Sequence, residues 1–233
     1  MMSFTGVLVN TGTVIFGSLL GLLFRKGIPE RVSSAVMIGL GLCAIYIGIE
    51  GALDGENMLI VIAAMVLGGI AGTLLDIDGG ISRLGRWVEN KFRRREGENA
   101  TVAQGFVTAS LLFCVGAMTV NGAIEAGVKG DDTIFYTKAT LDFFSSIMLT
   151  AGLGLGVMCS AAFVLVFQGL LVLLAGVIAP VLTPFAVAEM TCTGSLVMMG
   201  IGLNLIGATK IKVADYLPAI LFAPIICMIV GLF

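Results

Sequence analysis

A carboxylate and three hydroxyl side chains stand directly ahead of a long apolar run near the C-terminus. They are Glu189, Thr191, Thr193 and Ser195, and Asn204 lies deeper in the same run. A carboxylate in such a place can bind a cation or carry a proton. The same groups can instead bind the unpaired N–H groups at the start of a helix. The residue types leave an ion-binding site and a helix cap as alternatives.

Further polar residues open, or lie inside, other apolar stretches. Lys138 precedes Asp142 by four residues, so the two can pair on one helix face, either as an ordinary surface ion pair or as part of a gate. Asp142 and Glu189 are the carboxylates beside polar helix starts, which makes them candidates for binding a cation or a proton. The complete set of candidate substrate- or ion-binding residues is Asn10, Thr11, Thr13, Gln104, Thr108, Ser110, Asn121, Lys138, Asp142, Gln168, Glu189, Thr191, Thr193, Ser195 and Asn204.

The composition says what kind of elements must position these residues. Of the 233 residues, 58% are hydrophobic and 12% are charged, and the mean hydropathy is +1.08; a soluble domain carries about 25% charged residues. A helix needs roughly 20 apolar residues to cross a bilayer. We therefore expect an all-α polytopic membrane protein, one transmembrane domain over residues 1–233. Its eight expected spans lie near 4–24, 32–50, 57–75, 102–122, 140–158, 160–180, 189–208 and 214–233.

The distribution of basic residues predicts the orientation of these spans. Loops rich in lysine and arginine are retained in the cytoplasm. With the N-terminus outside, all 13 lysines and arginines except Lys129 and Lys138 fall in cytoplasmic loops or at their edges. Eight spans then place both termini outside the cell.

The segment near 81–95 has the pattern of a helix lying on the membrane surface. Apolar residues recur at three- and four-residue steps, and basic residues occupy the other faces. We expect Trp87 at the level of the lipid headgroups and Arg93, Arg94 and Arg95 facing anionic lipid. The alternative is a solvated linker.

Glycines recur at a spacing that lets helices approach closely. The pairs Gly17/Gly21, Gly68/Gly72 and Gly152/Gly156 have the small-xxx-small pattern that packs helices in membranes, either within the subunit or across an oligomer interface. We expect a homo-oligomer, most simply a dimer.

Glycine-rich segments also resemble one another in spans of opposite direction. "SSAVMIGLGL" from Ser33 aligns with "SSIMLTAGLGLGV" from Ser145, and "MIGLGLCAI" from Met37 with "MMGIGLNLI" from Met198. This predicts an inverted internal repeat, as in secondary transporters, although glycine-rich helices also match by chance. Prolines at 180 and 184 predict a broken or re-entrant helix near 180–195.

Several classes of function lack their residues. The chain has no histidine, its five cysteines are isolated, and no G-x-S-x-G elbow or acidic metal cluster is present. We expect no enzymatic activity, no metal centre and no cofactor. The net charge of −2 argues against binding of nucleic acid.

Four segments together resemble the bacterial membrane family called domain of unknown function 554 (DUF554). They are "GSLLGLLFRKGIPERV" from Gly17, "GFVTASLLFCVGAMTVNGAIEAG" from Gly105, "YTKATLD" from Tyr136 and "EMTCTGSLVMMGIGLNLIGATKIKVADYLPA" from Glu189. Where the family pattern reads "TATGG", this chain has Cys192 and Ser195, small residues in place of small residues. The resemblance covers essentially the whole chain and implies a protein of the bacterial cytoplasmic (inner) membrane, often described as a transporter, without an established substrate.

These observations lead to the expected function. We expect a transporter or channel that moves a small solute or ion across the inner membrane and that contacts membrane lipids. A non-transporting scaffold, or a protein that senses lipid or ions, is the alternative, since the basic segment near 81–95 fits it equally well.

Overall fold

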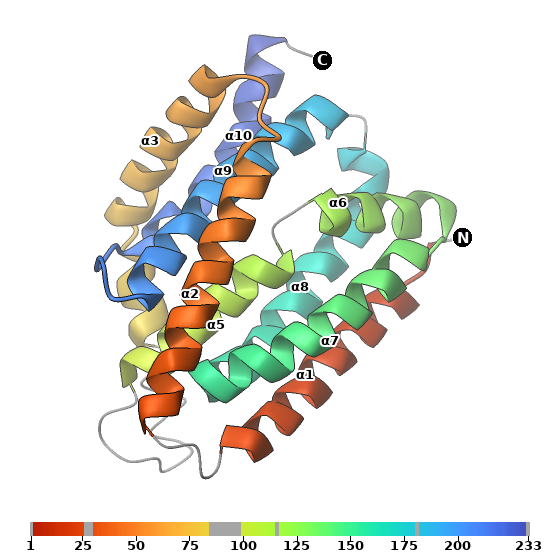
Figure 1. Ribbon diagram of the computed structural model, residues 1–233. Coiled ribbons are helices and arrows are strands. Elements are labelled where there is room, and N and C mark those ends of the chain that lie inside the picture. The colour runs from red at the N-terminus through yellow and green to blue at the C-terminus, as the bar shows by residue number, and fades with distance from the viewer. Residues whose placement is uncertain (1, 26–29, 84–98, 115–116, 180–181, 232–233) are drawn as a thin grey trace. The chain divides into compact units, whose positions relative to one another are not determined.

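Helices account for all regular structure in the part of the chain that the computed structural model describes, residues 2–25, 30–83, 99–114, 117–179 and 182–231 (Figure 1). The expected all-helical class is thereby confirmed. In chain order the elements are α1 (Thr5–Arg25), α2 (Glu30–Ala52), α3 (Met58–Leu74), α5 (Asn99–Cys114), α6 (Ala117–Ile124), the π-helix η1 (Glu125–Lys129), α7 (Thr133–Leu153), α8 (Leu155–Ile178), α9 (Pro184–Leu205), the 3-10 helix η2 (Val213–Tyr216) and α10 (Leu217–Val230).

By length and apolar composition, four helices within the described residues can cross a membrane: α1, α8, α9 and η2 with α10. The number rises to six if two bent pairs each form one span. In one pair, α3 continues into a short helix over Ile77–Arg83 at 51°; in the other, α5 continues into α6 and η1 at 56°. The eight expected spans thus exceed this count by α2 and α7. The described apolar part of α2 is short, Met37–Ala52, and α7 contains Lys138, Asp142 and many hydroxyl side chains.

The chain divides into two compact units. The first contains Met1–Val36, Ser82–Cys114 and Met118–Ile178, and the second contains Met37–Ile81, Val115–Ala117 and Ala179–Phe233. Helices α1, α5, α6, α7 and α8 belong to the first unit, whereas α3, α9, α10 and most of α2 belong to the second.

In the first unit, α1 lies along α7, as the red and green ribbons of Figure 1 show. Gly6 of α1 adjoins Phe135 near the start of α7, and Gly21 adjoins Thr150 near its end. Because both residue numbers rise together along the contact, α1 and α7 run parallel.

Helix α5 packs against α8 in the same unit, again in parallel. Gly156 at the start of α8 adjoins Val102 of α5, and further along the Phe106 and Phe163 rings meet edge to face with centroids 6.1 Å apart. A Cβ on Gly156 would collide with the backbone carbonyl oxygen of Val102, so only glycine allows this approach.

The second unit contains two antiparallel pairs. Helix α2 packs on α9, with Gly41 against Gly202 and Gly48 against Met199. Helix α3 packs on α10, where Gly68 adjoins Ala219 and Ile60 lies in one apolar cluster with Cys227. In each pair the residue numbers rise on one helix as they fall on the other.

The glycines singled out by spacing lie against helices of their own chain. A Cβ on Gly17 or Gly21 would overlap α7, and one on Gly68 or Gly72 would overlap Ala219 or Asp215. Gly152 is buried in α7. The contacts of Gly17, Gly21, Gly68 and Gly72 thus lie within the subunit.

The expected span near 189–208 placed the start of a helix at Glu189. In the structure the polar residues Glu189 to Ser195 instead lie inside a helix that starts earlier. Helix α9 begins at Pro184, with Thr183 as its N-cap: the Thr183 hydroxyl accepts a hydrogen bond from the Ala186 N–H at 3.2 Å. It then continues without a break to Leu205, so the broken helix expected near 180–195 is absent from 184–205. Proline at the first helical position fits a helix start, where its missing N–H costs nothing.

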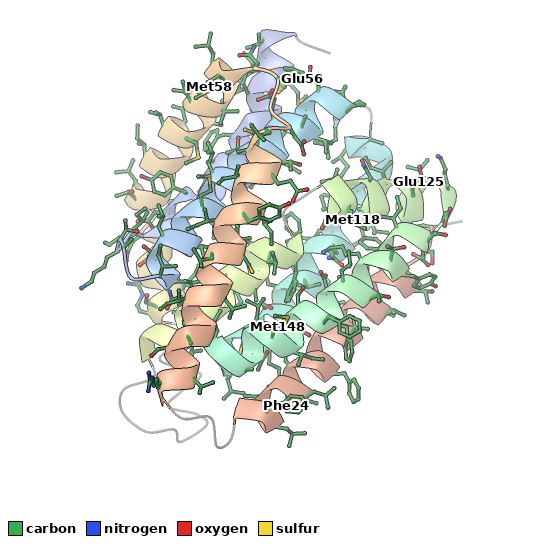
Figure 2. The ribbon with its side chains drawn as sticks, viewed as in Figure 1. Phe24, Glu56, Met58, Met118, Glu125 and Met148 are labelled. Carbon is green, nitrogen blue, oxygen red and sulfur yellow. The ribbon has the colours of Figure 1, made fainter. Side chains whose placement is uncertain are left out.

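Apolar side chains cover the outward surfaces of the helices. Leu59 and Leu74 of α3 are 77% and 81% exposed, and Val177 of α8 is 73% exposed. Phe24 projects outward from the end of α1 (Figure 2). Such surfaces suit lipid rather than water.

The expected surface helix lies largely outside the described residues. Residues 77–83 are helical after the bend that follows α3, but Trp87, Arg93, Arg94 and Arg95 belong to the segment 84–98, which the structure does not describe. Their expected place at the lipid headgroups stays a prediction.

Candidate functional site

Four polar side chains from three helices meet inside the first unit. Lys138 of α7 donates from Nζ to both carboxylate oxygens of Asp142, at 3.0 and 2.8 Å. Asn10 of α1 donates from Nδ2 to Asp142 Oδ2 at 3.0 Å and to Gln168 Oε1 of α8 at 3.1 Å. All four residues are buried, and Asn10 and Gln168 have no exposed surface. We call these four residues the Asp142 network.

The two amides of the network each lie between buried apolar residues of their own helix. Asn10 lies between Val7 and Val14 on α1, and Gln168 lies between Val164 and Val172 on α8. The three- and four-residue steps put these neighbours on one helix face. The sequence therefore directs the polar groups inward together with the apolar residues that pack the helices.

A break in the fourth expected span adjoins the network. Gln168 donates from Nε2 to the backbone carbonyl of Phe113 at 3.3 Å, and the Thr119 hydroxyl donates to the same oxygen at 3.3 Å. Phe113 lies at the end of α5, just before the bend into α6. Carbonyls in the last turn of a helix lack intrahelical partners, and side chains from elsewhere can satisfy them, as these two do here.

Two members of the network lie near the middle of their helices, whereas Asn10 is the sixth of the 21 residues of α1. Gln168 is residue 14 of the 24 in α8, and Asp142 is residue 10 of the 21 in α7. At 1.5 Å per residue, Gln168 is about 20 Å from the start of α8 and Asp142 about 14 Å from the start of α7. In a membrane the side chains of Asp142 and Gln168 would therefore lie deep in the hydrocarbon layer, which is about 30 Å thick.

One hydrogen-bond acceptor of the network has no donor among the described residues. Asn10 Oδ1 is buried and has no hydrogen-bond partner among the described residues. The same holds for the hydroxyl oxygens of Thr108 and Ser110 on α5. An unsatisfied buried polar atom costs about 1–3 kcal/mol, so such an atom calls for a ligand or a structural explanation.

Glu189 lies in the second unit and caps a helix other than its own. Its Oε1 accepts hydrogen bonds from the backbone N–H groups of Glu56 and Asn57, both at 2.7 Å. Asn57 is the N-cap of α3, whose start is marked by Glu56 and Met58 in Figure 2. Glu189 is fully buried, and its Oε2 has no partner among the described residues. The expected cap therefore exists, but it serves α3 rather than α9.

Three hydroxyls of the candidate set bind carbonyls of their own helices. Thr11 donates to Val7 O, Thr13 to Asn10 O and Thr193 to Glu189 O, each at 2.8 Å. Such bonds use the single donor of each hydroxyl within the helix, so these groups could serve a ligand only as acceptors.

The remaining candidates divide by location. Asn204 organises the connection after α9, where its Oδ1 accepts from Ile211 N–H at 2.9 Å and its Nδ2 donates to Ile211 O at 2.7 Å. Thr191 is buried without a hydroxyl partner among the described residues, and Ser195 lies against Gly51. Gln104 is half-buried and Asn121 is exposed.

Two polar groups of the structure were not predicted from the sequence. The Phe113 carbonyl becomes available because the chain bends after α5, and no proline marks that bend. Asp215 is buried and accepts from the Asp78 N–H at 2.9 Å, at the start of the short helix after α3. Its only signal in the sequence is a lone carboxylate just before an apolar run.

Comparison with known proteins identifies the family. The family described as "Protein of unknown function (DUF554)" matches residues 5–228. "Uncharacterized membrane protein YdfK" of Bacillus subtilis (strain 168) is 29% identical over 232 residues, covering 98% of this chain and 97% of that protein. "Uncharacterized protein YqgA" of Escherichia coli (strain K12) is 29% identical over 220 residues, covering 94% of each. No solved structure matches the chain.

The chain belongs to the DUF554 family, which confirms the resemblance seen in its sequence. With its apolar helices and a relative named as a membrane protein, it is a helical membrane protein of an uncharacterised family.

Proposed function

We propose that the chain is an eight-span transporter of a small solute or ion in the bacterial inner membrane, with both termini outside. The observation that carries this proposal is the Asp142 network, an ion pair and two amides buried between three helices, with Asp142 near the middle of α7 and Gln168 near the middle of α8. Ionisable residues at such depth are costly in a membrane, and they characteristically mark pathways for ions or substrates.

The bend between α5 and α6 supports the same proposal. Interrupted helices within a membrane are tolerated where their free backbone groups face protein or a water-filled cavity. In secondary transporters such interruptions form the binding site. Here the Phe113 carbonyl at the interruption is tied directly to Gln168 of the network.

The direction of helix packing supports α7 as a span. Helices α5 and α8 run parallel in the first unit, with α7 between them in the chain. Two spans can be parallel only if an odd number of crossings separates them. The proposal therefore has α7 cross the membrane although its hydrophobicity is low.

The other three pairs fit the same scheme. As first and fifth spans, α1 and α7 run parallel, whereas α2 with α9 and α3 with α10 are antiparallel. Eight alternating crossings reproduce all four directions. If the α5 to α6 pair turned back instead of crossing, α1 and α7 would be antiparallel.

The alternative is a scaffold or a sensor of lipid or ions, and the basic segment near 81–95 is the feature that favours it. A scaffold has no use for a charged pair in mid-helix, because apolar residues of similar volume are at least as stabilising. The proposal accordingly assigns the chain neither catalysis nor a cofactor.

The test is flux through the purified protein in liposomes. Isotope uptake and charge movement are measured for a panel of monovalent ions and small zwitterions. We expect flux in the wild type, loss of flux in Asp142→Asn, and wild-type flux in Lys129→Gln. The control removes a lysine from an i,i+4 ion pair, Lys129 with Glu125, which is exposed instead of buried. A folded, inserted protein that moves nothing in the panel contradicts the proposal.

A homo-oligomer, most simply a dimer with two-fold symmetry, is part of the proposal. Most soluble oligomers of one chain are symmetric, and two-fold symmetry is the commonest. The contacts of Gly17, Gly21, Gly68, Gly72 and Gly156 lie within the subunit, so the dimer must use other surfaces. Native mass measurement in lipid-like detergent should show a multiple of 24.2 kDa; a species that remains monomeric at all concentrations contradicts the dimer.

A further inference from the structure

We propose that the Asp142 network is a binding site for a monovalent cation and that the Lys138 ammonium is a tethered competitor for that site. The inference rests on the proposed transport function and specifies what the site takes. It follows from the balance of donors and acceptors around Asp142, from the net charge of the network, and from the place of Lys138 on α7.

The first argument is the excess of acceptors. Asp142 offers two carboxylate oxygens, and Asn10 Oδ1 is buried with no partner among the described residues. Gln168 Oε1 and Asp142 Oδ2 both accept from Asn10 Nδ2, at 3.1 and 3.0 Å, so oxygens from α8 and α7 lie around one amide of α1. Oxygen ligands of this kind suit a hard cation. A carboxylate or phosphate ligand would add acceptors where one acceptor already lacks a donor.

The second argument is the charge. The net charge of Asp142 and Lys138 together is zero. Among the described residues, Asp142 is the one carboxylate that bonds Lys138. Divalent cations are held by several carboxylates at once, and the described part of the chain has no group of three or more acidic, cysteine or histidine side chains placed to hold a metal ion. A single carboxylate with neutral amides matches a single positive charge.

The third argument is that Lys138 already occupies the place of such a cation. Its Nζ contacts both oxygens of Asp142, and Asn10 Nδ2 shares one of them. Lys138 is on the same helix as Asp142, four residues before it, so its flexible side chain can leave the carboxylate without movement of the helices. A free cation then takes the oxygens that the ammonium releases, together with Asn10 Oδ1.

A purely structural ion pair is the competing explanation, and it makes different predictions. A structural pair loses stability when either partner is removed, and no solute restores it. A tethered competitor loses stability in the same way when Lys138 is removed, but a free cation then replaces the missing ammonium at Asp142.

The experiment measures cation binding by the purified full chain in detergent micelles. Thermal unfolding is followed in Na⁺ or K⁺ and in N-methylglucamine at equal ionic strength, and isotope binding gives the affinity. If the Lys138 ammonium leaves Asp142 at most about a tenth of the time, Lys138→Gln should bind the cation at least about tenfold more tightly than the wild type. The melting temperature of Lys138→Gln should recover in Na⁺ or K⁺.

Three further variants make the result specific. Asp142→Asn should lose cation binding, and Asn10→Ala should weaken it. The double variant Lys138→Gln with Asp142→Asn carries neither charge, so it should fold and show no response to the cation. Lys129→Gln, from the exposed pair, should behave as the wild type. Equal cation affinity in Lys138→Gln and the wild type overturns the inference, as does binding that survives in Asp142→Asn.

The outcomes separate this inference from the transport function. Flux in liposomes that is independent of monovalent cations supports the proposal of a transporter and contradicts the proposal of a cation site. Specific cation binding with no flux for any solute supports the cation site and contradicts the transporter. If neither is found in a folded protein, both proposals fail.

Discussion

At the scale of single residues, two carboxylates that look alike in the sequence have different surroundings. Asp142 meets a lysine and an amide, both side chains of the first unit. Glu189 meets two backbone N–H groups at the start of α3 in the second unit. The charge of Glu189 is therefore balanced by a helix N-terminus, and the charge of Asp142 by an ammonium.

Replacement of Glu189 tests this difference. In Glu189→Gln the amide oxygen can still accept from Glu56 and Asn57, but the charge at the helix start is lost. We expect a cost of about 1 kcal/mol in the free energy of unfolding and unchanged flux. Glu189→Ala should cost more, about 1–3 kcal/mol for each N–H left without an acceptor. Loss of flux in a well-folded Glu189→Gln would instead assign the residue to ion handling, as its sequence context alone allows.

Asp78 follows the third expected span, near 57–75, and gives a prediction of pH dependence. Its carboxyl pKa is raised above the ordinary value of 3.8, first by burial and then by the charge of Asp215, although Lys212 acts in the opposite direction. The folded protein thus holds this proton more tightly than the unfolded chain. Stability is therefore lost as the pH rises from 3.8 through the raised folded-state pKa.

Replacing Asp78 by Asn should remove this loss. We expect Asp78→Asn to melt at a higher temperature than the wild type at neutral pH, with the difference shrinking as the pH falls towards 3.8. Melting curves of both proteins over that range provide the measurement. Asp131→Asn serves as the control, because the Thr133 hydroxyl and N–H lower the pKa of Asp131 and the variant should lose stability at neutral pH. An equal difference at every pH would contradict the role of Asp78 protonation.

For single residues, the sequence predicts which side chains form an ion pair better than it predicts whether that pair is buried. The four-residue step between Lys138 and Asp142 suffices to place them together, and they are together. Their burial depends on Asn10 and Gln168, and Asn10 is 132 positions from Asp142 and 158 from Gln168. Such long-range contacts leave no periodic signal, so the surface pair and the buried pair look the same in the sequence.

At the scale of helices, apolar stretches between charges locate the elements well, but prolines mislead about their ends. Pro184 was expected to interrupt a helix, and it begins one. The bend after α5 follows Cys114 without any proline. Helix boundaries depend on caps such as Thr183, whereas a bend stabilised by Gln168 of another helix depends on tertiary contacts that local sequence does not encode.

Close helix contact through glycine gives the prediction that belongs to this scale. Gly156 and Gly176 both lie in α8, but a Cβ on Gly156 would strike the backbone of α5, whereas one on Gly176 would meet open space. We expect Gly156→Ala to cost about 1–3 kcal/mol in the free energy of unfolding because α5 and α8 must separate. Gly176→Ala should gain up to about 1 kcal/mol from helix propensity. Equal melting temperatures for the two variants would contradict the close packing of α5 on α8.

At the scale of the whole molecule, both units are built from two helix pairs joined by glycine contacts. In the first unit the pairs are α1 with α7 and α5 with α8, and in the second they are α2 with α9 and α3 with α10. In each unit, therefore, the first helix packs on the third and the second on the fourth. The inverted repeat was predicted from the similarity of α2 to α7 and to α9. In this packing order α2 is the first helix of its unit, whereas α7 and α9 are each the third, so the packing order does not test the repeat and it stays a prediction.

The arrangement of eight crossings makes the last prediction, which concerns topology. In a cysteine-free background, Arg93→Cys should react only with reagents that reach the cytoplasm, and Glu50→Cys and Asp131→Cys should react from outside. Residues 50 and 131 are both exposed, so a lack of reaction there would reflect location rather than burial. The informative comparison is between 93 and 131, which flank the bent α5 to α6 pair. If the pair spans the membrane, the two sites react on opposite sides. If it enters and turns back, both react on the same side; α7 would then run against α1, contrary to the parallel contacts of Gly6 with Phe135 and Gly21 with Thr150.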